Sequence, residues 1–161
     1  MKKIGFDIGN VVSKVNMYSL RYFDSRYLEI PLREGAVETL IEVVKKYSPK
    51  NVFLISKCSP LFMRRTNEWL TAKMFFEITG IFEGNLLYCA HVADKAQIAR
   101  TFGLSAFVDN DENVLKHMKG IVDTLYLFHP KIDDEVGNRF VDLHANYIVC
   151  PDWNTLAQRI L

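Results

Sequence analysis

The segment IGFDIGNVV, residues 4–12, decides the fold. Its first three residues suit a short buried strand, and the run stops at an aspartate followed by glycine and asparagine, which favour a turn. The same pattern occurs twice more. The apolar run Val52–Ile55 stops at Ser56, and the run Ala106–Val108 stops at Asp109. We therefore expect buried strands that each end at a polar residue.

Helical patterns separate these runs. Val37, Leu40, Ile41 and Val44 fall at the i, i+3, i+4, i+7 spacing of an amphipathic helix. The sequence predicts strands at about 4–6, 52–55, 86–89, 106–108, 125–128 and 147–149, and helices at about 37–44, 60–74, 95–102, 112–118 and 153–160. Strands alternating with helices indicate a mostly parallel sheet covered on both faces, a three-layer α/β/α sandwich. Ligands bind beyond the carboxyl ends of the strands in such sheets.

Length and composition favour one domain, residues 1–161, because 161 residues with 49% apolar and 24% charged content are typical of a globular domain. The net charge of +1 gives no electrostatic case for nucleic acid or an anionic membrane. Cys58, Cys89 and Cys150 have no CxxC spacing, so we expect free thiols. The N-terminus lacks a signal-peptide pattern, and no apolar run is long enough to span a membrane. We expect a cytoplasmic protein without a membrane partner.

Four polar residues occur along the chain in an order that is more informative than any one of them alone. Asp7, Ser56 and Asp109 each end an expected strand, and Lys95 lies between the second and third of them. In these residues, and in the flanking segments 4–12, 52–56 and 106–111, the sequence resembles the haloacid dehalogenase (HAD) superfamily over nearly its whole length. The resemblance implies a HAD-like Rossmannoid fold and a Mg²⁺-dependent phosphohydrolase.

The roles that this resemblance implies agree with simple chemistry. Asp7 would be the nucleophile and form an aspartyl-phosphate, which splits one difficult displacement into two easier ones. Ser56 would donate a hydrogen bond to a phosphoryl oxygen, and Lys95 would neutralise the phosphate and the Asp7 charge. Mg²⁺ would be held by the carboxylates of Asp7 and Asp109 and by the backbone carbonyl of Gly9.

Residues next to these positions are secondary candidates. Asn10 and Lys57 lie close enough in sequence to contact the substrate. One of Asn110, Asp111 and Asn113 would complete the metal site or support Lys95, and the spacing does not choose between them. Asp111 is equally suited to cap the helix that follows it.

The sequence departs from the family pattern at Gly9. Most phosphatases of the superfamily carry a second aspartate there as general acid and base, a function worth about 10²–10⁴-fold in rate. Some members with an Asp-x-Gly-Asn-Val motif are nonetheless phosphatases. His91 is the only other residue that we single out as a substitute acid, and an incidental loop histidine is the better explanation for it. The alternative function is a catalytically weak module that binds a phospho-ligand or a protein.

Two further classes fit the sequence less well. A receiver-like phospho-acceptor domain has an acidic pair after its first strand and its acceptor aspartate after the third, whereas here a single aspartate comes first and the acidic cluster comes late. Neither a Walker loop nor a GxGxxG motif follows a strand, so nucleotide-cofactor folds are unsupported.

The intervals between the four residues leave little room for a cap domain. Residues 13–31, with Tyr18, Tyr22 and Phe23, suffice for a hairpin flap or a short helix only. We therefore expect a capless member of the family. Since water would not be excluded by the chain itself, a large phosphorylated substrate or a neighbouring copy in a homo-oligomer would cover the site. The phosphorylated substrate is either a small molecule or a macromolecule.

Overall fold

The central sheet confirms the expected fold class. The computed structural model describes residues 1–16, 19, 26–128 and 146–161. Its six strands form one parallel sheet in the order β3-β2-β1-β4-β5-β6. The strands are β1 (Ile4–Phe6), β2 (Val52–Lys57), β3 (Leu86–Cys89), β4 (Ala106–Asp109), β5 (Thr124–Phe128) and β6 (Ile148–Cys150). The order reverses between β1 and β4, which is where doubly wound sheets bind their ligands.

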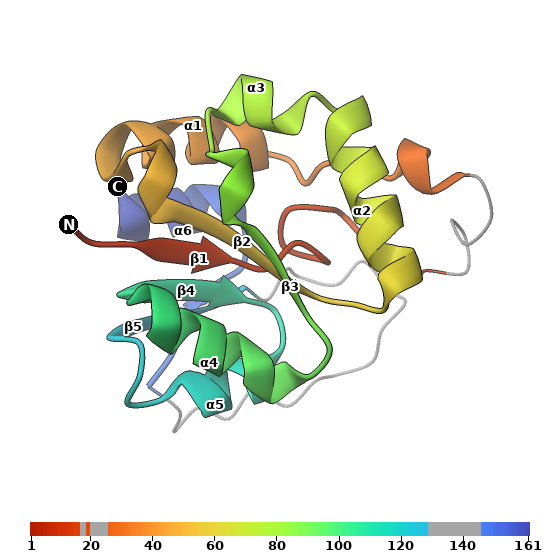
Figure 1. Ribbon diagram of the computed structural model, residues 1–161. Helices are drawn as coiled ribbons and strands as arrows, with labels where there is room; N and C mark the ends of the chain where they lie inside the picture. Colours follow the sequence, from red (N-terminus) through yellow and green to blue (C-terminus); the bar gives the residue numbers. More distant parts are fainter. Residues whose placement is uncertain (17–18, 20–25, 129–145) are drawn as a thin grey trace.

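Helices cover both faces of this sheet (Figure 1). The helices are α1 (Ala36–Tyr47), α2 (Pro60–Ala72), α3 (Phe75–Thr79), α4 (Val92–Phe102), α5 (Glu112–Met118) and α6 (Trp153–Ile160). Short 3-10 helices are η2 (Arg26–Glu29), η3 (Pro49–Asn51) and η4 (Glu83–Asn85). Helices α1, α2, α3 and α6 pack on one face, and α4 and α5 pack on the other, which gives the expected three layers.

Alternation along the strands divides the core between these layers. Ile4 and Phe6 of β1 belong to the cluster under α1 and α6, whereas Phe107 of β4 belongs to the cluster under α4 and α5. Gly5 faces this second cluster. A Cβ atom on Gly5 would lie 2.6 Å from Phe107 Cδ2 and 2.8 Å from Leu104 Cδ1, so only glycine fits there.

The segment after β2 differs from its sequence prediction. Helix α2 begins at Pro60 as predicted, and Ser59 at its N-cap position makes no side-chain hydrogen bond to the helix. The helix ends at Ala72 instead of Met74, because Met74 adopts a left-handed backbone conformation with φ 49°. A separate short helix, α3, then follows, which the sequence pattern did not predict.

Other boundaries moved by a few residues. Helix α1 extends beyond 37–44 at both ends, and α4 begins at Val92, three residues before Lys95. Gly103 ends α4 with φ 65°, as expected of a glycine just past a helix. Strand β6 lies at 148–150 instead of 147–149. These shifts do not change the order of the elements.

The flap expected at 13–31 lies partly outside the described residues. Residues 17–18 and 20–25, which include Tyr18, Tyr22 and Phe23, lie outside the described residues. Ser13 pairs with Leu32 in an isolated antiparallel bridge, and η2 follows the undescribed part. Within the described ranges, no helix is long and apolar enough to cross a membrane.

Candidate active site

Two neighbouring strands bring Asp7 and Asp109 to the same edge of the sheet. Phe6 of β1 is paired with Val108 of β4, so the next residues lie at the same level, Asp7 just after β1 and Asp109 as the last residue of β4. The backbone N–H of Asp7 donates to the Val108 carbonyl at 2.9 Å. Both carboxylates are buried, with 7% exposure for Asp7 and 1% for Asp109.

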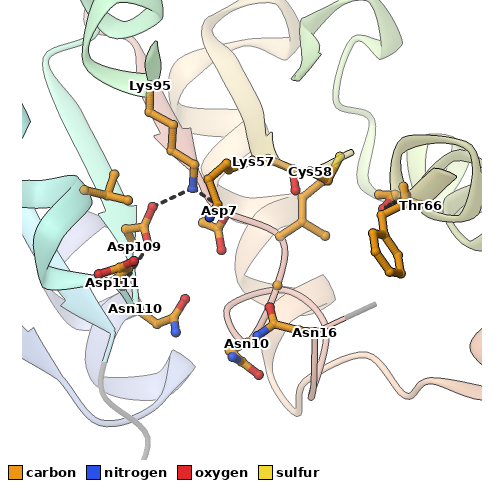
Figure 2. Close-up of a pocket in the computed structure, with 15 residues that line it drawn as sticks. Asp7, Asn10, Asn16, Lys57, Cys58, Thr66, Lys95, Asp109, Asn110 and Asp111 are labelled. Carbon is orange, nitrogen blue, oxygen red and sulfur yellow. Dashed lines mark hydrogen bonds and ion pairs between the residues drawn. The ribbon is translucent and has the colours of Figure 1, made fainter. Parts of the chain in front are cut away.

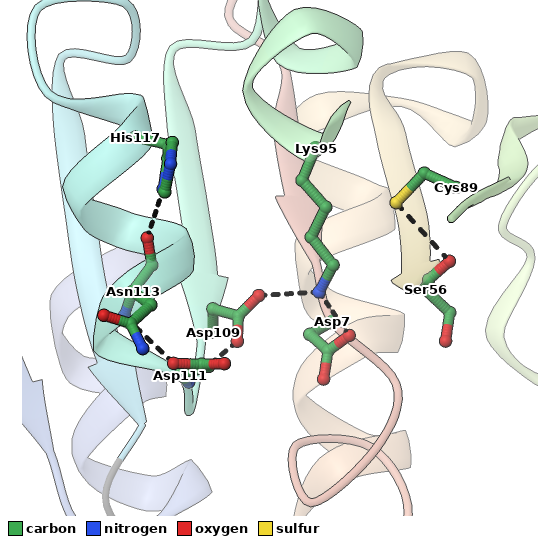
Figure 3. A network of polar contacts seen from close by, with 8 residues as sticks. All are labelled: Asp7, Ser56, Cys89, Lys95, Asp109, Asp111, Asn113 and His117. Atoms are coloured by element: carbon green, nitrogen blue, oxygen red, sulfur yellow. Dashed lines mark hydrogen bonds and ion pairs between the residues drawn. The ribbon is translucent and has the colours of Figure 1, made fainter. Parts of the chain in front are cut away.

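Lys95 joins these two carboxylates (Figure 3). Its Nζ lies 2.6 Å from Asp7 Oδ1 and 2.8 Å from Asp109 Oδ2. Helix α4 supplies the lysine from its first turns, and the side chain is almost completely buried. Because one ammonium contacts both groups, the two carboxylates are close enough to bind one common ligand. The metal site predicted from the sequence needs this proximity.

Burial and charge act against each other in this triad. Burial alone would lower the pKa of Lys95, but its ion pairs with Asp109 and Asp7 outweigh burial and raise it. Burial, and to a smaller extent the nearby charge of Asp7, raise the pKa of Asp109 to about 7, against the opposing effect of Lys95. Two carboxylates and one ammonium leave an excess of one negative charge when all are ionised. This excess is an electrostatic reason for a cation here.

The donor set fits a hard divalent cation. Asp7, Asp109 and the Gly9 backbone offer oxygen ligands, which Mg²⁺ prefers. Lys95 contacts only one oxygen of each carboxylate, and in Figure 3 the second oxygen of Asp7 points away from the lysine. Among the described residues, no group of three or more His, Cys, Asp or Glu side chains could hold a metal. The metal ligands predicted from the sequence include only two such side chains, those of Asp7 and Asp109. The third predicted ligand is the backbone carbonyl oxygen of Gly9.

One pocket collects almost all of the predicted residues (Figure 2). Its lining includes every catalytic, substrate-binding and metal residue predicted from the sequence: Asp7, Gly9, Asn10, Ser56, Lys57, Lys95 and Asp109. Asn110 and Asp111 line it as well. Asn10 adopts a left-handed conformation with φ 62°, which asparagine tolerates better than most residues. The residues therefore converge from the ends of β1, β2 and β4 and from α4.

The residues after Asp109 have distinct places. Asp111 caps α5, since its Oδ1 accepts the Asn113 N–H at 2.9 Å, so the helix-cap interpretation is confirmed. The Asp111 N–H also donates to Asp109 Oδ1 at 2.8 Å and so orients that carboxylate. Asn113 does not line the pocket. Its carbonyl instead contacts His117 Nδ1 at 2.7 Å.

His91 does not line the pocket either. It is exposed at the N-terminus of α4, where its backbone N–H donates to Asp94 Oδ2 at 2.9 Å. The one histidine considered as a substitute acid is therefore not placed at the predicted nucleophile.

The sequence analysis did not predict several residues that line the pocket, among them Asn16, Cys58, Phe62 and Thr66. Phe62 and Thr66 are four residues apart on α2, so they share a helix face, and Thr66 Oγ1 donates to the Phe62 carbonyl at 2.8 Å. The start of α2 just after Ser56 was a usable signal for these two. Burial raises the pKa of the Cys58 thiol, which disfavours its nucleophilic thiolate form.

The cysteines are free thiols, as expected. Cys150 is buried in the core, while Cys58 and Cys89 are partly exposed. Burial raises the pKa of Cys89 to about 11, so this thiol is also a weak nucleophile.

Comparisons with known proteins place this geometry in context. No family model and no curated protein matches the sequence. A HAD-superfamily hydrolase from Ehrlichia chaffeensis is similar in structure, with a TM-score of 0.59 and 9% identity over 99% of this chain and 97% of the other. The cobalt-bound deoxy-D-mannose-octulosonate 8-phosphate phosphatase from Haemophilus influenzae has a TM-score of 0.56 and 13% identity over 100% of this chain and 84% of the other. The chain therefore has the fold of HAD-superfamily hydrolases.

Proposed function

We propose that this protein is a Mg²⁺-dependent phosphomonoester hydrolase that acts through an aspartyl-phosphate on Asp7. The main supporting observation is the buried triad, in which Lys95 joins Asp7 to Asp109 at the reversal point of the sheet. A buried ion triad is an expensive way to stabilise a fold, because apolar residues of similar volume serve as well. Its presence at a pocket therefore favours a chemical role.

The side chains around Asp7 suit the two steps of this reaction. A carboxylate oxygen of Asp7 would attack phosphorus while the ester oxygen departs with the bonding electrons, and water would then hydrolyse the acyl phosphate and restore the carboxylate. Lys95 would offset the negative charge on the transferring group, and Ser56 at the end of β2 would donate a hydrogen bond to one of its oxygens.

The metal would be held by Asp7, Asp109 and the Gly9 carbonyl. When bound, a divalent cation reduces the repulsion between the anionic nucleophile and the anionic phosphate. The donor set and the excess negative charge of the triad support this assignment, and Mg²⁺ is the ion that we propose.

The chain is proposed to be a single capless domain. The segment between β2 and β3 is occupied by α2 and α3, whose Trp69 and Phe75 are buried in the core of one helical layer. A large phosphorylated substrate or a second copy of the chain would then cover the pocket. We also propose a cytoplasmic location.

Mg²⁺-dependent hydrolysis of p-nitrophenyl phosphate tests the proposed function. We expect Asp7→Asn to abolish turnover and to abolish the phosphorylated peptide detected by mass spectrometry after acid quenching. Asp123→Asn is the matched control, because Asp123 is exposed just before β5, at the opposite edge of the sheet. Equal activity in both variants would show that Asp7 is not the nucleophile.

The second candidate function is a binding module on the same fold, which the glycine at position 9 favours. It predicts that the wild-type protein binds beryllofluoride with Mg²⁺ in calorimetry but turns over no phosphate ester. Turnover that depends on Asp7 would eliminate this alternative.

A further inference from the structure

The space beside Gly9, where a side chain at position 9 would lie, is filled by another residue of the pocket. A Cβ atom on Gly9 would collide with Asn16 Oδ1 and lie 3.3 Å from Asn16 Cγ. The amide of Asn16 therefore occupies the space into which a side chain at residue 9 would begin to project. Both residues line the pocket, and Figure 2 shows Asn16 on the side of Asp7 opposite to Lys95.

The loop from β1 holds Asn16 in this place. The Ile8 carbonyl accepts the N–H groups of Val12 and Ser13, each at 2.9 Å. The fully buried Ser13 hydroxyl lies 2.7 Å from the carbonyl of Val15, the residue before Asn16. The return of the chain over Gly9 is thus fixed by hydrogen bonds on both sides of the turn.

The chemistry of an amide decides what this residue can do. An in-line displacement places the leaving oxygen on the far side of phosphorus from Asp7. Figure 2 shows Asn10, Asn16 and Asn110 on the side of Asp7 away from Lys95, and all three line the pocket. An amide donates a hydrogen bond to an oxyanion but does not protonate it. The other carboxyl in the lining, that of Asp111, is engaged as the cap of α5.

We propose that Asn16 donates a hydrogen bond to the leaving-group oxygen, an inference that rests on the proposed function. The site is then specialised for phosphate compounds with acidic leaving groups. These are acyl, enol and aryl phosphates, whose leaving oxygen departs as a stable anion. The phosphorus–oxygen bond to the leaving group breaks as Asp7 bonds to phosphorus, and the leaving oxygen keeps the electron pair. Its later protonation comes from solvent. Phosphate esters of simple alcohols are then poor substrates.

A series of aryl phosphates that differ in the pKa of the leaving phenol tests this specialisation. With Mg²⁺ present, we expect kcat/KM of the wild type to fall steeply as the phenol becomes less acidic. Asn16→Asp places a carboxyl at the same point, so it should raise turnover of the poorest leaving group on the order of 10²-fold, the low end of what a general acid provides. This substitution should also make kcat/KM depend less steeply on the pKa of the leaving phenol, most clearly at acid pH. Asn16→Ala should lower kcat about tenfold across the series.

Gln97→Glu is the matched control, because Gln97 is exposed and outside the pocket and yet gains the same charge. We expect it to keep the steep dependence of the wild type. A shallow dependence in the wild type, or an unchanged slope in Asn16→Asp, overturns the assignment while leaving the phosphatase proposal standing. An absence of turnover with every ester and with acetyl phosphate overturns both.

Discussion

Replacing Lys95 with methionine keeps most of the length of the side chain and removes its charge. The ammonium lies 2.6 Å from Asp7 Oδ1 and 2.8 Å from Asp109 Oδ2, and both carboxylates are buried. Loss of one partner leaves the other charges uncompensated in the interior, which costs about 3–5 kcal/mol. That is a large part of a typical folding free energy of about 5–15 kcal/mol. We therefore expect Lys95→Met to be strongly destabilised in metal-free buffer.

The loss of stability in Lys95→Met should depend on pH. Without the ammonium, the pKa of Asp109 rises further in the native state, because Lys95 no longer opposes the effect of burial. The ordinary pKa of an aspartate is about 3.9. Over the pH range between these values the native state binds more protons than the unfolded state, so stability falls as pH rises. The effect of the substitution should therefore be larger at pH 8 than at pH 5. Mg²⁺ should recover part of the loss at pH 8 if it binds the native state as proposed.

Urea unfolding followed by tryptophan fluorescence measures these differences, and Lys45→Met provides the matched control. Lys45 Nζ lies 2.6 Å from Glu42 Oε1, the same distance as in the buried pair, but the two side chains are 67% and 52% exposed. An exposed pair of this kind contributes less than about 1 kcal/mol. A similar, pH-independent loss in the two variants would refute the conclusion that burial gives the Lys95 triad its energetic weight.

Three other substitutions test separate parts of the structure by urea unfolding. Burial raises the pKa of Asp109 to about 7, so the free energy of unfolding in EDTA should fall as pH rises from about 4 to 7. Asp109→Asn should flatten this pH dependence. An equally steep dependence in the variant would contradict the assignment to Asp109. Gly5→Ala should cost about 1–3 kcal/mol, because its Cβ would overlap Phe107, and a neutral effect would show that the sheet adjusts freely. Trp153→Phe should cost about 1–3 kcal/mol, because it leaves the Val11 carbonyl without the indole N–H at 2.9 Å; unchanged stability would show that this bond is dispensable.

The central site was predictable because parallel strands constrain it strongly. A fully buried strand has to be apolar on both faces, so the end of each run is visible in the sequence as the first polar residue. Asp7, Ser56 and Asp109 all stand at such ends, and the parallel arrangement gathers them at one edge of the sheet. Lys95 followed from the family resemblance, since nothing in its local pattern distinguishes it from a surface lysine.

Residues placed by the path of a loop were not predictable in the same way. Asn16 reaches Gly9 because hydrogen bonds at Ile8 and Ser13 turn the chain back, and no periodicity encodes that return. Helix α3 exists because Met74 takes a left-handed conformation that methionine rarely adopts. Asp111 shows a third limit, since one residue both caps a helix and lines the pocket, and its type alone fits either role.

The loop after β1 is held in place by parts of the chain that do not line the pocket. Trp153, in the first turn of the last helix, donates its indole N–H to the Val11 carbonyl across the core and stacks on Phe6 at a centroid distance of 5.7 Å. Arg33, which precedes α1, donates its backbone N–H to the Val12 carbonyl at 2.8 Å. The positions of Gly9 and Asn16 therefore depend on α6 docking and on the start of α1. Since misplacement by about 1 Å can reduce catalysis about 10²-fold, changes in the last helix should affect turnover before they unfold the protein.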